Sequence, residues 1–271
     1  MSKFKYIYGP VASWRLGKSL GVDLLSTDEK VCSFNCPYCQ LGTANRLLGG
    51  GTSEASDSSK VAAGYERRVF VSTEVVMDEL KQLPDVEIDY ITFSGMGEPT
   101  LAANLGEVVA EIRKLRKEPI AILTNSSLIC EPVVQADLML MDRVIVKLDA
   151  ATQGTFERAS QPVGDLQLTA IIRGLCSFRQ IYKGHLDLQM MFTEINEHEA
   201  KDMAGLARVI KPDQVELNTP LRPCGVEPLS RERLARVQDL FSGMIVRNVY
   251  DRKEFTTDVL DDSEVSRRGR K

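Results

Sequence analysis

The sequence predicts an α/β protein built as a partial barrel of about six βα units. From about residue 73 onward, segments with the two-residue hydrophobic period of strands alternate with segments that have the 3.6-residue period of helices. An early strand, expected at residues 20–25, adds the first unit. With 271 residues the chain is long enough for one large domain that buries roughly three quarters of its unfolded surface. Strands and helices that alternate in this way form a parallel sheet wrapped by helices, and six units leave the barrel incomplete.

The elements that follow the first strand are justified by their apolar patterns. A helix is expected over residues 73–83, where apolar side chains recur three or four residues apart before Pro84. A strand follows at residues 88–94. The next helix, residues 105–115, has an apolar stripe on one face and arginines and lysines on the other. A strand at residues 120–124 completes this unit.

The same alternation continues to residue 241. The remaining expected elements are a helix at 133–138, a strand at 143–149, a helix at 168–178, a strand at 186–192, a helix at 203–210, a strand at 214–218 and a helix at 234–241. In such folds the carboxyl ends of the strands carry the site, because the βα loops converge there on a rigid scaffold. Motifs that carry chemistry are therefore expected directly after strands.

Two segments depart from the alternation. Residues 42–64 contain the run GGGTSEASDSS, which has the composition of a flexible loop. Residues 251–271 end in the charged run SEVSRRGRK. We expect one core domain over residues 1–250, with a flexible loop at 42–64, and a mobile, solvated C-terminal tail over 251–271.

Charge and hydrophobicity narrow the class of protein. Lysine and arginine number 34 against 38 aspartates and glutamates, so the net charge of −4 excludes a global basic field. No stretch approaches the roughly 20 apolar residues of a membrane helix, and residues 1–8 lack the pattern of a secretory signal. We therefore expect a cytoplasmic protein with no membrane partner. In that compartment the six cysteines are better suited to be ligands, catalysts or core residues than disulfides.

The strongest motif is a group of cysteines directly after the first strand: Cys32, Cys36 and Cys39. A zinc ion would take a fourth ligand, yet His185, His198 and the other three cysteines lie at no paired spacing. A four-iron, four-sulfur cluster held by three thiolates leaves one iron open for a cofactor or substrate. The alternatives are buried cysteines or half of a zinc ribbon, as in a zinc-bound, non-enzymatic module that binds nucleic acid.

A glycine-rich motif, FSGMGEPT, ends the second strand. Gly95 and Gly97 allow backbone angles closed to other residues and let the main chain approach a ligand closely. Main-chain carbonyls with Glu98 nearby suit an ammonium group. The alternative is an ordinary glycine turn.

Together, CxxxCxxC after the first strand and GxGEP after the second resemble the radical S-adenosylmethionine (SAM) superfamily over about residues 20–241. The resemblance implies a partial (βα)6 TIM-like barrel in which Cys32, Cys36 and Cys39 bind one four-iron, four-sulfur cluster. The open iron would take the amino and carboxylate groups of SAM. The implied reaction is reductive cleavage of SAM to methionine and a 5′-deoxyadenosyl radical, which abstracts hydrogen from a substrate.

The resemblance also implies contacts to SAM. The candidate residues are Tyr38, Gly95, Gly97, Glu98, Asn125, Asp149 and Asn218. Tyr38 is the aromatic residue before the third cysteine, beside the adenine, and the Gly95–Glu98 motif contacts the methionine ammonium. Met96 stands where glycine or asparagine is commoner in the family. The polar residues on the later strand ends have capping of the following helices as their alternative role.

A narrower resemblance rests on residues 8–23, YGPVASWRLGKSLGVD, with the cysteine motif and the QLG that follows it. These segments are similar to a bacterial and archaeal branch of iron-sulfur oxidoreductases related to the tRNA wyosine-base synthases. Those synthases carry a second cluster on upstream cysteines, and this chain has no cysteine before Cys32, so the wyosine reaction is not implied. They also hold pyruvate on a lysine. Lys147 is the candidate for that catalytic role, and a salt bridge near Asp149 or to a cofactor carboxylate is the favoured alternative.

The relation to these synthases makes RNA bases the leading substrate class, with a protein or a small molecule as the alternative. It also implies an electron donor such as flavodoxin or ferredoxin. Cys224, in the loop after the sixth strand, is a second catalytic candidate that would bind substrate or return a hydrogen atom. Its alternative is a passive loop thiol. Because the cysteines outside the motif are isolated, we expect a single cluster.

Overall fold

A curled sheet forms the centre of the protein. The computed structural model describes residues 4–42, 66–251 and 256–269, and the flexible loop expected at 42–64 falls almost entirely outside them. The strands are β1 (Ile7–Ser13), β2 (Gly17–Val22), β3 (Tyr90–Phe93), β4 (Ile120–Thr124), β5 (Arg143–Lys147), β6 (His185–Met191), β7 (Gln214–Asn218) and β8 (Val246–Asn248). Their order in the sheet is their order in the chain. β1 and β2 pair antiparallel, and every later pair is parallel.

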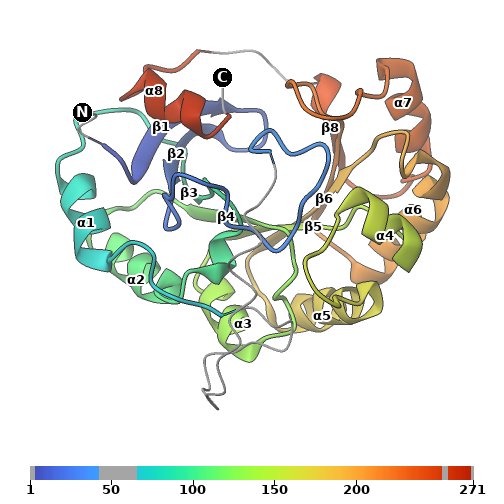
Figure 1. The fold of residues 1–271 in the computed structure, drawn as a ribbon, viewed down its shortest axis with the longest axis horizontal. Helices are drawn as coiled ribbons and strands as arrows, with labels where there is room; N and C mark the ends of the chain where they lie inside the picture. Colours follow the sequence, from blue (N-terminus) through green and yellow to red (C-terminus); the bar gives the residue numbers. More distant parts are fainter. Residues whose placement is uncertain (1–3, 43–65, 252–255, 270–271) are drawn as a thin grey trace.

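Helices cover the outer face of this sheet (Figure 1). They are α1 (Thr73–Lys81), α2 (Leu105–Leu115), α3 (Pro132–Leu138), α4 (Gln153–Ala159), α5 (Leu168–Ile181), α6 (Ala200–Ile210), α7 (Arg231–Asp239) and α8 (Asp262–Arg267), with single 3₁₀ turns at Pro99–Leu101, Glu197–Glu199 and Val249–Asp251. Parallel neighbours need a crossover, and the helices supply it while burying the outer face of each strand. β1 and β8 remain as the two edges of the sheet, so the barrel is incomplete, as the sequence predicts.

All six predicted strands and the helices between them form, and β1, α4, β8 and α8 are additional. β1 carries Pro10, which interrupts a strand pattern because proline cannot donate to a ladder. The structure places this strand at an edge of the sheet, where such a residue is tolerated. Among the described residues no helix is long and apolar enough to cross a bilayer.

A small inner cluster lies apart from the main core, which packs the helices on the sheet. Leu16, from the turn between β1 and β2, packs on Ala121 of β4 and Ile145 of β5. These residues come from the hairpin and from positions on the inner face of the barrel. The β1–β2 hairpin thus places an apolar side chain inside the barrel.

The C-terminal residues differ from the solvated tail that the sequence predicts. α8 packs against β1, and Leu260 N–H donates to Gly9 O at 2.7 Å. Arg268 is fully buried. The prediction of a solvated segment is therefore wrong for Val265 and Arg268, because the Arg268 guanidinium is buried by partners far away in the chain.

Candidate active site

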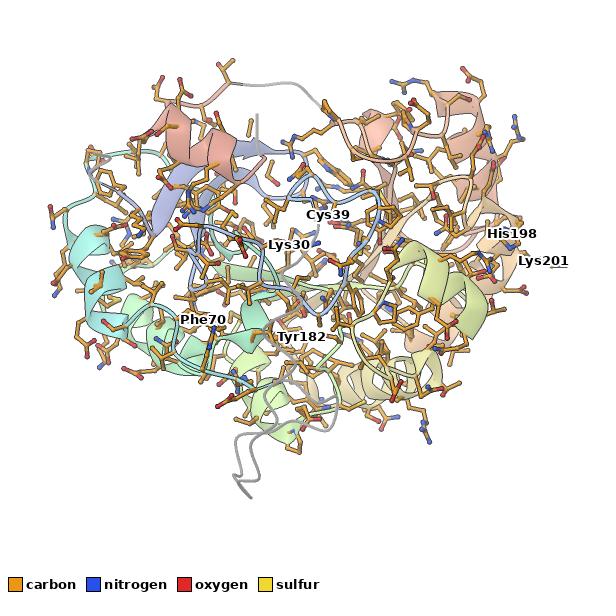
Figure 2. The ribbon with its side chains drawn as sticks, in the orientation of Figure 1. Lys30, Cys39, Phe70, Tyr182, His198 and Lys201 are labelled. Atoms are coloured by element: carbon orange, nitrogen blue, oxygen red, sulfur yellow. The ribbon has the colours of Figure 1, made fainter. Side chains whose placement is uncertain are left out.

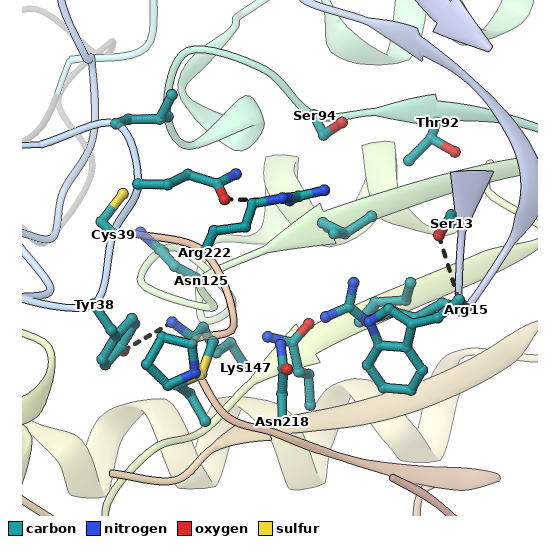
Figure 3. Close-up of a pocket in the computed structure, with 18 of the residues that line it drawn as sticks. Ser13, Arg15, Tyr38, Cys39, Thr92, Ser94, Asn125, Lys147, Asn218 and Arg222 are labelled. Carbon is teal, nitrogen blue, oxygen red and sulfur yellow. Dashed lines mark hydrogen bonds between the residues drawn. The ribbon is translucent and has the colours of Figure 1, made fainter. Parts of the chain in front are cut away.

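One cavity of about 780 Å³ occupies the inside of the barrel and the carboxyl ends of its strands. Of the residues that the sequence singles out, Cys32, Cys36, Tyr38, Cys39, Gly97, Glu98, Asn125, Lys147 and Asn218 line it. Gly95, Asp149 and Cys224 are not among its lining residues. Figure 3 shows Cys39, Tyr38, Asn125 and Lys147 on one side of the cavity and Arg15 on the other. Residues from the loops after β2, β3 and β4 and from the last positions of β5 and β7 thus meet in one space, as expected for a barrel of this kind.

Residues 31–39, here called the cysteine segment, follow β2. They are held by the main chain of residues 93–100, the glycine motif. Val31 N–H donates to Met96 O at 2.8 Å, and Glu98 N–H donates to Val31 O at 2.9 Å. Within the segment, Cys39 N–H donates to Cys36 O at 2.9 Å and forms a turn. The two motifs that the sequence identifies separately are therefore one hydrogen-bonded unit.

The thiols lie in a dry environment. Burial raises the pKa of Cys32 to about 12 and also raises the pKa of Cys36. Asn125 Nδ2–H donates to Cys32 Sγ at 3.5 Å and to Ser33 Oγ at 2.8 Å. Because a metal binds cysteines as thiolates, the raised pKa values of Cys32 and Cys36 mean that metal binding would release their protons.

The spacing of the donors distinguishes a cluster from a single ion. Among the described residues, no three histidine, cysteine, aspartate or glutamate side chains are grouped closely enough to share one metal ion. A zinc site requires such a group, whereas a four-iron cluster spreads its ligands because each thiolate binds a different iron. Figure 2 places His198 at the periphery of the molecule, far from Cys39. Three cysteines in one short segment are the donor set that a four-iron cluster with one open iron uses.

The glycines of the motif are required by packing. A Cβ atom on Gly97 would lie 1.6 Å from Val31 O, and one on Gly95 would lie 2.1 Å from Asp23 Cγ. Both residues have positive φ, 147° and 156° for Gly95 and Gly97. The sequence predicts glycine here for close approach of a ligand. In the structure the side of Gly97 that lacks a side chain faces the cysteine segment instead.

Glu98 joins two strand ends. Its carboxylate is buried and accepts hydrogen bonds from Thr100 Oγ1 and Thr124 Oγ1, both at 2.7 Å, and from Asn125 N–H at 2.6 Å. Burial raises the pKa of Glu98, and these hydrogen bonds oppose that shift. Glu98 therefore fixes the turn after β4, including Asn125, against the glycine motif.

Lys147 and Asp149 form a pair at the end of β5. Lys147 Nζ lies 2.9 Å from Asp149 Oδ2, and it donates to Tyr38 Oη at 2.8 Å. Tyr38 Oη–H in turn donates to Asp149 Oδ2 at 2.5 Å. Burial lowers the pKa of Lys147, but the charge and hydrogen bond of Asp149, together with Cys36 and Cys39, raise it, and the net pKa is raised. Lys147 is thus an ammonium group that ties the cysteine segment to β5, which matches the salt bridge favoured from the sequence.

The loop after β7 brings Asn218 and Cys224 to different places. Asn218 lines the cavity, and its Oδ1 accepts from Thr219 N–H at 2.9 Å. Cys224 Sγ lies 3.3 Å from Val226 O. Gly225 N–H donates to Pro37 O at 3.1 Å, so this loop contacts the cysteine segment although the Cys224 side chain does not line the cavity.

The sequence analysis missed the contribution of the β1–β2 hairpin. Trp14 and Arg15 line the cavity at the end opposite the cysteines, and the Arg15 guanidinium lies 4.4 Å from the centre of the Trp14 ring. Arg15 Nε pairs with Glu216 Oε2 of β7 at 2.6 Å. Turns at the amino ends of strands are not expected to reach a site in a barrel. Trp14 and Arg15 lie in the 8–23 segment, which resembles a known branch of the superfamily. That resemblance did not imply a function for either residue.

Comparison with known proteins identifies the family. The profile of the radical SAM superfamily matches residues 30–207. The chain belongs to this superfamily and is an enzyme of it, and membership implies an iron-sulfur cluster and SAM.

A curated relative is similar to this chain in sequence, and two solved structures are similar in fold. A UPF0026 protein of Synechocystis is 38% identical over 230 residues, which is 84% of this chain and 79% of the relative. The structure of TYW1 with a lysine-pyruvate adduct bound is similar in fold, with a TM-score of 0.58 at 14% identity over 83% of this chain and 74% of that one. Streptococcus suis SuiB bound to S-adenosylmethionine gives 0.59 at 13% identity over 84% and 52%. The relation to wyosine synthases inferred from the 8–23 segment is thus confirmed at the level of fold.

Proposed function

We propose that this protein is a radical SAM enzyme that binds one four-iron, four-sulfur cluster on Cys32, Cys36 and Cys39 and cleaves SAM reductively inside the barrel. The observation that carries the proposal is that all three cysteines line the same cavity as Tyr38, Glu98 and Asn125. Cys32, Cys36 and Cys39 would hold the cluster, and a reduced cluster bound there would supply the electron for cleavage of SAM to methionine and a 5′-deoxyadenosyl radical, which would abstract hydrogen from the substrate.

The protein itself binds and orients the cofactor. We assign the main chain of Gly95–Glu98 to the ammonium group of SAM, with the Glu98 carboxylate supporting that main chain through its hydrogen bonds. We assign Tyr38 to the adenine, and Asn125 and Asn218 to polar groups of the nucleoside, because all three line the cavity. The Lys147 ammonium is suited to the cofactor carboxylate, because Asp149 keeps it charged and held at the cavity wall.

A charged Lys147 is a poor candidate for an adduct with a carbonyl compound, because that chemistry needs a neutral amine. Cys224 remains a candidate for a substrate-side role only if the loop after β7 moves, since its side chain does not line the cavity in this structure. The proposed catalytic work of the protein is thus positioning and exclusion of water.

The substrate must present its reacting C–H bond inside the barrel. The cavity reaches from the cysteines to Trp14 and Arg15 and is bounded there by Leu16. A small molecule or a single extruded RNA base fits such a space, whereas a folded protein surface does not. We propose an RNA base as the leading substrate class, with a small molecule or an extended peptide as the alternative, and flavodoxin or ferredoxin as the electron donor.

Reductive cleavage of SAM tests this proposal. The protein, reconstituted anaerobically with iron and sulfide and reduced with dithionite, is expected to form 5′-deoxyadenosine from SAM. The same protein prepared without iron should form none. A reconstituted protein that carries the cluster and binds SAM, yet releases no 5′-deoxyadenosine, would contradict the proposed reaction.

A further inference from the structure

Arg268 is fully buried although it lies next to the end of the described chain. Its Nε–H donates to Asp23 Oδ2 at 2.8 Å, and its Nη2–H donates to Lys5 O at 2.6 Å. Nη1 pairs with Glu264 Oε2 at 2.5 Å. The guanidinium carbon lies 4.5 Å from the centre of the Tyr8 ring. Every face of this cation is therefore engaged, by α8 on one side and by β1 and the residues after β2 on the other.

Arg268 contacts the Asp23 carboxylate and the Tyr8 ring, and both of these side chains also contact the glycine motif. Asp23 Oδ2 also accepts from Met96 N–H at 3.3 Å, and the Asp23 carboxylate fills the space where Gly95 has no side chain. Tyr8 Oη and Ser94 Oγ are 2.6 Å apart. One carboxylate and one phenol thus contact residues 94–96 of the motif, and both are in contact with the same guanidinium.

The other oxygen of Asp23 is occupied. Oδ1 accepts from Leu25 N–H at 3.2 Å and from Ser26 N–H at 3.0 Å, so the carboxylate uses both oxygens to shape the chain after β2 and the turn after β3. Asp23 is 1% exposed. Without the Arg268 guanidinium this deeply buried carboxylate would lose its charged hydrogen-bond partner, which favours a move of the side chain toward water. Such a move would weaken the hydrogen bond from Met96 N–H.

We propose that Arg268 is a positioning residue for SAM, acting through Asp23 and Tyr8 on residues 94–97. This inference rests on the proposed function, which assigns the Gly95–Glu98 main chain to the SAM ammonium. Arg268 itself does not line the cavity. The C-terminal segment thus belongs to the cofactor site and is not a tail appended to a complete barrel.

The test compares Arg268→Gln with Arg267→Gln. Arg267 lies on the same short helix and donates to Ser26 Oγ at 3.0 Å and Thr27 O at 3.1 Å, but it makes no contact with Asp23 in the described hydrogen bonds. Supporting side chains behind a ligand shell typically contribute about 10- to 100-fold to affinity. We expect Arg268→Gln to weaken SAM binding to the reconstituted protein by about tenfold and to raise KM for SAM without lowering kcat, whereas Arg267→Gln keeps wild-type affinity.

Amide hydrogen exchange of residues 94–98 in the metal-free protein gives an independent readout. Arg268→Gln should accelerate exchange there and leave β4 to β6 unchanged. If that variant does not fold, Asp23→Asn with Arg268→Gln removes both charges together. It should lose SAM affinity to the same extent, because an amide has one acceptor oxygen where Asp23 uses two. Arg268→Lys keeps the charge and should recover part of the affinity.

The inference is overturned if a folded Arg268→Gln or double variant binds SAM as the wild type does and shows unchanged exchange at residues 94–98. If the wild type itself does not bind SAM, the proposed function fails. The exchange measurement still decides then whether Arg268 fixes the turn.

Discussion

The two ends of the barrel carry similar charged residues and use them differently. At the amino end of the strands, Arg143 Nε pairs with Asp187 Oδ2 at 2.5 Å, and Arg15 pairs with Glu216 at 2.6 Å. His185 Nε2 lies 2.9 Å from Asp187 Oδ1. These charges join β5, β6, β7 and the β1–β2 hairpin to one another.

At the carboxyl end the charged groups join strands to loops. Glu98 holds the turn after β4, and Lys147 with Asp149 holds Tyr38 of the cysteine segment. The same residue types therefore join strands to one another at the amino end, where Arg15 also lines the cavity, and join strands to the cysteine-bearing loop at the carboxyl end. Variants at the amino end should lower the free energy of unfolding, and variants at the carboxyl end should lower cluster or cofactor binding.

Loss of any motif cysteine should have the largest effect. Cys32→Ala, Cys36→Ala or Cys39→Ala leaves two thiolates for a cluster that needs three, so we expect no stable cluster and no SAM cleavage. Iron analysis and the yield of 5′-deoxyadenosine measure this. Cys176→Ala, on α5, is the matched control and should keep both. A single variant that retains full cluster iron would show that the motif is not the ligand set.

Gly97→Val should disturb the cysteine segment. The new Cβ would lie 1.6 Å from Val31 O, so the segment beside Cys32 must move, and both cluster iron and SAM affinity should fall. Gly205→Val, where a Cβ meets nothing within 4 Å, should leave both unchanged. Normal iron content in a folded Gly97→Val protein would show that cluster binding does not depend on the packing of Gly97 against the cysteine segment.

Asp187→Ala tests the amino end. Breaking a buried ion pair by removing one partner typically costs about 3–5 kcal/mol, because Arg143 is left buried without its carboxylate. Denaturant unfolding should show that loss, while the remaining folded protein binds SAM normally. Asp251→Ala breaks an exposed pair with Arg231 and should cost less than about 1 kcal/mol. A loss of SAM affinity in Asp187→Ala without a loss of stability would contradict the division between the two ends.

Glu216 should make the stability depend on pH. Burial raises its pKa from 4.5 to about 7, although Arg15 and Arg143 lower it. Because the folded protein binds this proton more tightly than the unfolded chain, the stabilisation is complete below about pH 4.5 and is lost as pH rises through 7. Relative to Glu216→Gln, the free energy of unfolding of the wild type should fall by up to about 3 kcal/mol over that range. Parallel curves for the two proteins would contradict the raised pKa.

Much of the fold and of the cavity could be predicted from the sequence, because strand and helix periods and short cysteine spacings are local signals. β1 could not, since Pro10 breaks its pattern and its partner is antiparallel. Arg268 could not either. Its burial depends on Asp23, 245 positions away, and a charged run near a chain end is usually solvated. The prediction for Gly97 was incomplete for a similar reason. Its packing against Val31, which is distant in the sequence, could not be foreseen.

Iron, sulfide and zinc analysis of the anaerobically reconstituted protein is the decisive test of a single four-iron, four-sulfur cluster on Cys32, Cys36 and Cys39. The account predicts about four irons and about four sulfides per chain, a brown protein, and no zinc. Cys224→Ala should give the same values, because its side chain lies outside the cavity lining. A colourless protein with about one zinc per chain, or one with about eight irons, would contradict a single cluster on Cys32, Cys36 and Cys39.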